Sequence, residues 1–65
     1  MTEADIWGTT RKMVELYGAA AHQVAVTRAE RLMMEGNVQG STRWHQISFA
    51  IRGIQARRAE ERPAR

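Results

Sequence analysis

Three side chains that could support nucleophilic or acid–base chemistry lie close together in the second half of the chain. Ser41, His45 and Ser48 fall within two turns of one another if this stretch is helical. A hydroxyl beside an imidazole can act as a nucleophile with its base. However, no acidic residue is spaced to orient the imidazole, and no glycine-rich loop accompanies it to bind an oxyanion. We therefore interpret the three residues as a polar helix flank and predict that the protein is not an enzyme.

The histidines and glutamates are the candidate metal ligands. His22 and His45, together with Glu15 or Glu35, offer the ligand types of a zinc site. No two of these residues have the one-face spacing of a helical metal motif, and the chain has no cysteine. It also has no phosphate-binding loop, dinucleotide fingerprint or pair of carboxylates. We predict no metal, no cofactor and no small-molecule substrate.

Length and composition limit the protein to one small domain. A chain of 65 residues buries only about 60% of its unfolded surface. Without cysteine, it has no disulfide that could compensate for a small core. Close helix packing or self-association must supply the remaining stability, so a homodimer is an open alternative.

Charge and hydropathy give expectations about location. The formal net charge is +3, and nine of the ten basic residues are arginine. Acidic residues follow Met1 where a secretory signal would have a basic segment and an apolar run. The longest uncharged run, residues 16–27, is too short to span a bilayer. We therefore expect a cytoplasmic protein that does not insert into membranes.

The apolar periodicity predicts three helices. The first ends near Tyr17, because Gly18 follows where a left-handed residue commonly ends a helix. The second covers residues 19–35 and the third residues 38–60, with a turn of about two residues between them. The apolar face of the first helix consists of Ile6, Thr10, Met13 and Tyr17, with Trp7 and Val14 beside them. The face of the second helix, the alanine stripe, consists of Ala21, Ala25, Ala29 and Leu32. The face of the third helix, the apolar or isoleucine seam, consists of Trp44, Ile47, Ile51 and Ile54.

These elements predict an all-α fold of three helices. The short turn at Gly36 and Asn37 makes the second and third helices an antiparallel hairpin, and the first helix packs across it. Residues 1–60 form the single domain. Residues 61–65, which follow the end of the apolar seam and contain Pro63, form a frayed C-terminal tail.

The order of several residues in the second helix, the turn and the third helix resembles that of a known group. The residues are Arg28-Ala29, Leu32, Gly36-Asn37, Gly40, Trp44, Ile47 and Ile51. In this spacing, residues 7–54 are similar to a group of short helical proteins from alphaproteobacteria. That group usually has aspartate at the position of Asn37, and an acidic cap is common at the position of Ala19. The group has no assigned activity, so the resemblance implies the helical fold and no particular function.

Some apolar residues lie away from the predicted core. Phe49 lies opposite the centre of the isoleucine seam, Met34 opposite the alanine stripe, and Leu16 off the main face of its helix. Three such residues in a small chain indicate a second surface that is buried by a second copy or by another protein. The alternative, which we leave open, is that three helices wrap closely enough to bury two faces of the third.

The short turn also fits a helix-turn-helix protein. Gln39, Ser41, Thr42 and Arg43 would then begin the recognition helix. The arginines of this helix point in different directions with glutamates among them, whereas a phosphate-binding surface forms a patch or stripe. We rank nucleic-acid binding second for that reason.

The first-ranked hypothesis is a small interaction or regulatory module, such as an inhibitor or a dimeric scaffold. It would act through an apolar helical surface centred on Phe49 and Met34, with Arg52 and Leu16 as further contacts.

Overall fold

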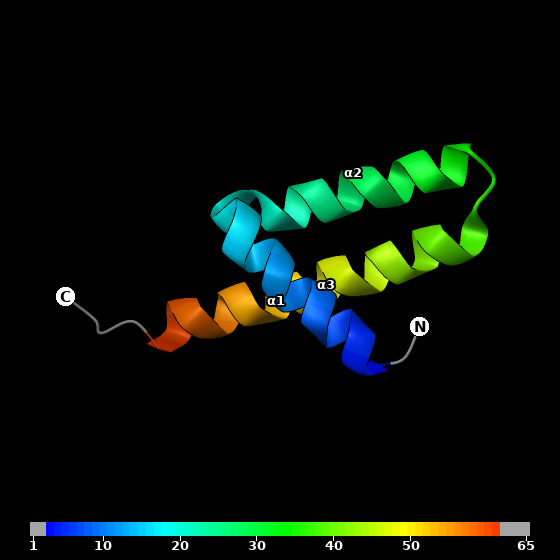
Figure 1. Cartoon of the computed structure of the whole chain (residues 1–65). Helices are drawn as coiled ribbons and strands as arrows, with labels where there is room; N and C mark the ends of the chain where they lie inside the picture. The colour runs from blue at the N-terminus through cyan, green and yellow to red at the C-terminus, as the bar shows by residue number, and fades with distance from the viewer. Residues whose placement is uncertain (1–2, 62–65) are drawn as a thin grey trace.

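The computed structural model describes residues 3–61, with side chains from residue 5 onward. Its elements are helix α1 (Glu3–Tyr17), the short 3-10 helix η1 (Gly18–Ala20), helix α2 (Ala21–Met34) and helix α3 (Val38–Glu61) (Figure 1). The predicted all-helical composition is therefore confirmed for this part of the chain. The predicted tail falls, from residue 62 onward, outside the described residues, and Glu61 is the last residue of α3.

The prediction of three separate helices is wrong. Helix α1 continues through η1 into α2 with no non-helical residue between them, so residues 3–61 form two uninterrupted helical segments, 3–34 and 38–61. Gly18 has a φ of +52°, and this left-handed residue bends the first segment without opening a loop. The three alanines that follow it are strong helix formers, so the backbone returns to a helical conformation at once.

The turn between α2 and α3 forms as its sequence predicts. Gly36 has a φ of +85°, and its N–H and that of Asn37 donate to the carbonyls of Met33 at 3.0 Å and Leu32 at 2.8 Å, which is a Schellman motif. The Oδ1 of Asn37 then accepts the N–H of Gly40 at 2.9 Å and caps α3. A Cβ at position 40 would lie 2.9 Å from the Asn37 side chain, so glycine there makes room for the cap.

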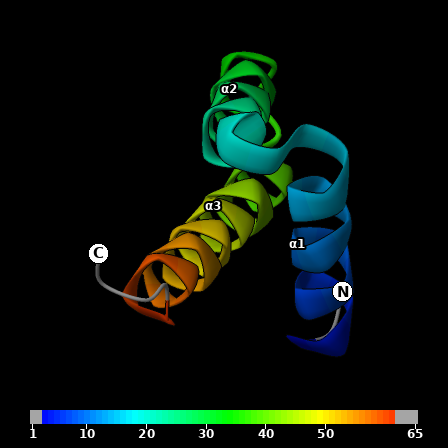
Figure 2. The same cartoon turned by 90° about the vertical axis from the view of Figure 1, so that its left-hand side faces the viewer.

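Small residues form the contact between α2 and α3, which run antiparallel to each other (Figure 1). The three alanines of the predicted stripe are fully buried, and Ser41 and Ser48 of α3 are buried too. Small side chains let two helix backbones approach closely. The larger core residues are Met13 and Val14 of α1 with Ile47 and Ile51 of α3, so α1 covers a second side of α3 (Figure 2).

Trp44, which periodicity places on the apolar face of the third helix, is only partly buried and packs against the edge of the core. The guanidinium of Arg28 lies over its indole, 5.0 Å from the centroid. The same guanidinium lies 5.9 Å from the ring centroid of Tyr17, and its Nη2 donates to the Tyr17 hydroxyl at 3.2 Å. Arg28 of α2 therefore connects the end of α1 to α3.

Two further hydrogen bonds fix the bend against α3. The amide of Gln55 donates to the carbonyl of Gly18 at 3.0 Å. The Nδ1 of His22 lies 3.1 Å from the carbonyl of Ser48. Because a carbonyl only accepts, Nδ1 carries the proton of this hydrogen bond. The first residue of η1 and the first turn of α2 are thus both tied to α3.

Candidate functional site

The predicted partner-binding residues are exposed in the single chain. The exposed fraction is 72% for Phe49, 64% for Leu16 and 88% for Met34, and Arg52 is exposed as well. The helices therefore do not wrap closely enough to bury the outer face of α3, which answers the alternative left open by the sequence.

These residues do not form one surface. His22 contacts the carbonyl of Ser48, so the start of α2 lies beside the middle of α3, close to Phe49. Met34 is twelve residues further along α2, which is about 18 Å at the rise of an α-helix. Leu16 lies on α1, near the bend. Met34 is therefore separated from Phe49, and it lines a different hollow together with Thr27, Glu30, Arg31 and Glu35.

The helix-turn-helix candidates are only partly available to a ligand. Gln39 and Thr42 are exposed, and Arg43 is half-buried. Ser41 is fully buried between the helices, and the hydroxyl of Thr42 donates to the carbonyl of Val38 at 3.0 Å. In addition, α2 and α3 run antiparallel side by side (Figure 1), whereas the two helices of a helix-turn-helix cross at about 90–120°.

Within the described residues, the side chains of Ser41, His45 and Ser48 make no hydrogen bond to one another. The hydroxyl of Ser48 donates to the carbonyl of His45 at 2.7 Å. The hydroxyl of Ser41 is buried and makes no hydrogen bond within the described residues. Residues 3–61 also contain no group of three or more potential metal ligands, and none of their helices is long and apolar enough to cross a membrane.

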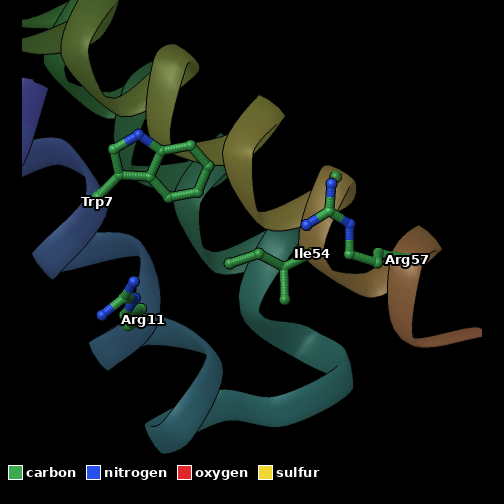
Figure 3. A pocket seen from close by; sticks show the side chains of 5 residues that line it. Trp7, Arg11, Ile54 and Arg57 are labelled. Carbon is green, nitrogen blue, oxygen red and sulfur yellow. The ribbon is translucent and has the colours of Figure 1, made fainter. Parts of the chain in front are cut away.

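One hollow of the described surface lies between α1 and the C-terminal half of α3. It has a volume of about 520 Å³ and is lined by Trp7, Arg11, Gly53, Ile54 and Arg57 (Figure 3). Trp7 extends its indole from α1 toward α3, and Ile54 points into the space between the two helices (Figure 3). The indole is 45% exposed, so an aromatic side chain forms part of an open wall.

Two further hollows continue this one along α1. The next is lined by Arg11, Val14, Glu15, Ile54 and Arg58, and so shares two residues with the first. The third adds Gly18, Ala19, Gln55 and Ala59 to Val14 and Arg58. Helices α1 and α3 diverge toward the C-terminal end of α3 (Figure 2). Together the three hollows make one continuous surface, which we call the α1–α3 groove.

The α1–α3 groove has an apolar floor and a basic rim. Val14 and Ile54 provide the floor, and Trp7 extends it at one end. Three arginines line the groove, Arg11, Arg57 and Arg58, against one acidic residue, Glu15. The arginines that seem scattered along the third helix thus include two that join Arg11 on the same side of the molecule.

Gly53 also opens the groove. It lies in the interior of α3, where glycine costs about 0.5–1 kcal/mol relative to alanine. A Cβ at this position would meet nothing within 4 Å, so the packing of this chain does not require glycine. A side-chain-free position on a binding surface allows another backbone to come close.

The sequence did not reveal this groove. Trp7 and Val14 are identified only as residues beside the main face of α1, and Arg57 and Arg58 follow the end of the apolar seam. One signal was present: the apolar seam ends at Ile54, yet α3 continues to Glu61, so its last two turns extend past the hydrophobic core.

Comparison of the chain with protein-family models, curated proteins and solved structures finds no match. The function therefore has to be inferred from the residues and their geometry.

Proposed function

We propose that the protein is a small interaction module that holds a segment of a partner protein in the α1–α3 groove. The observation that carries this proposal is the half-exposed Trp7, which lies beside Ile54 in an elongated groove rimmed by Arg11 and Arg57. Aromatic residues and arginine are enriched at protein interfaces and dominate their binding energy.

The proposal moves the interaction surface away from the residues favoured by the sequence. Phe49 and Met34 are more exposed than Trp7, but each lies apart from the other. The groove instead combines an anchor, a concave shape and charge in one place, and a specific interface needs these features together. Self-association stays within the proposal if a second copy supplies the segment that binds.

A matched pair of charge reversals tests the proposal. Arg57→Glu changes a groove residue, and Arg52→Glu makes the same change on the exposed outer face of the same helix. Each variant and the parent are purified with bound proteins from cells that naturally produce the chain. We expect one partner to co-purify with the parent and with Arg52→Glu, and to be lost from Arg57→Glu.

The reverse result would contradict the proposal. If the partner stays on Arg57→Glu and is lost from Arg52→Glu, the interaction surface is the outer face of α3. Circular dichroism of both variants provides the control, because neither exposed arginine contributes to the core and both proteins should keep the helical signal of the parent.

A further inference from the structure

We infer that the partner segment is an acidic, amphipathic helix of about three turns. This inference rests on the proposed function and adds the chemical class of the partner. It follows from the length, the floor and the charge of the α1–α3 groove.

The length comes from the residues that line the groove along α1. They begin at Trp7 and reach Gly18 at the bend, eleven residues later. At the rise of an α-helix this is about 16 Å, which a partner helix of about eleven residues would match in three turns.

The floor selects a partner with one apolar face. Trp7, Val14 and Ile54 are spread along the groove and not gathered in a single deep pocket. An amphipathic helix presents apolar residues at i, i+3, i+4 and i+7, and so places several anchors along such a line. Gly53, and Ala19 and Ala59 at the other end, let the backbone of that helix approach closely.

The rim selects a partner with acidic flanks. Arg11, Arg57 and Arg58 outnumber the single Glu15 among the residues lining the groove. Glutamate or aspartate on both sides of the apolar face would accept hydrogen bonds from the guanidinium groups, which can donate to a carboxylate in bidentate geometry. A basic or neutral helix would fit the floor but would leave these charges unmatched.

Synthetic peptides test the inference. The probe is a 14-residue stapled helix, one turn longer than the groove at about 1.5 Å per residue, with leucines on one face and glutamates on both flanks. Two matched controls replace every glutamate by glutamine or scramble the order of the residues. Binding is followed by the fluorescence of Trp7 in a Trp44→Phe background, which removes the second indole while keeping an aromatic ring beneath Arg28.

We expect the acidic peptide to bind and the scrambled peptide not to bind. Each exposed ion pair is worth about a twofold to threefold change in affinity, so three together make the glutamine peptide weaker by roughly 8-fold to 27-fold. Arg57→Glu with Arg58→Glu should lose the acidic peptide and gain a lysine version of it. Arg52→Glu should bind the acidic peptide as the parent does.

Three results would overturn the inference. Equal affinity for the glutamate and glutamine peptides would show that charge does not select the partner. No binding by any peptide would exclude a helical segment of this kind. Tighter binding of a single-stranded oligonucleotide, stacked on Trp7 with its phosphates on the arginines, would show that the groove recognises nucleic acid. The first two results leave the proposed function standing if Arg57→Glu still loses the cellular partner.

Discussion

The bend at Gly18 gives the sharpest test of the fold, because either enantiomer of alanine can be placed there. The chain is short enough for chemical synthesis, so Gly18 can be replaced by L-alanine or by D-alanine. With a φ of +52°, the backbone at this position is in the left-handed region. An L residue there costs about 1–2 kcal/mol, whereas a D residue adopts it without strain.

The stability change caused by L-alanine at position 18 comes from backbone conformation alone. An L-oriented Cβ at Gly18 would meet nothing within 4 Å, so steric overlap adds no cost. We expect L-alanine to destabilise the protein by about 1 kcal/mol or more. D-alanine should stabilise it by about 0.4–1 kcal/mol, because it reduces the conformational freedom of the unfolded chain.

Thermal unfolding followed by circular dichroism measures the difference. A free-energy change of 1 kcal/mol shifts the Tm of a domain this small by about 4–8 °C, so the two variants should differ by roughly 6–24 °C. If the L-alanine variant is as stable as the parent, or more stable, Gly18 is not left-handed. The segment 3–34 would then be a straight helix, and α1 would not cross α3.

Three other substitutions test parts of the account. Gly53→Ala should stabilise the protein by about 0.5–1 kcal/mol in urea unfolding but weaken partner binding. The control is Gly8→Ala, whose added Cβ also meets nothing within 4 Å and which should stabilise the protein without affecting binding. Equal binding by both variants would show that Gly53 does not contact the partner. Ser41→Ala should stabilise by about 1 kcal/mol, because it removes a buried hydroxyl with no hydrogen-bond partner in the described residues; a loss of stability would mean that this hydroxyl is bonded. Arg28→Ala should cost about 1–2 kcal/mol through its two ring contacts, and an unchanged urea midpoint would show that Arg28 does not hold α1 in place.

The features that could be predicted from the sequence depend on local rules. The end of α1 at Tyr17 and the cap at Asn37 follow from residues whose backbone preferences act over one turn. The burial of Ile47 and Ile51 follows from helical periodicity.

The features that were missed depend on how the elements meet. A left-handed glycine predicts the end of a helix, but whether a loop follows is decided by the next residues, here three alanines. Trp44 packs beneath Arg28, which lies sixteen positions earlier in the chain, and a local pattern does not reveal that contact. The groove depends on how α1 crosses α3, and neither helix carries that information alone (Figure 2).

Photo-crosslinking inside cells that naturally produce the protein shows which surface of α3 the partner contacts. A p-benzoylphenylalanine in place of Arg57 would lie in the α1–α3 groove, and one in place of Phe49 would lie on the outer face of α3. We expect a single covalent adduct with a partner protein from position 57 and none from position 49. An adduct from position 49 without one from position 57 would contradict the proposed function.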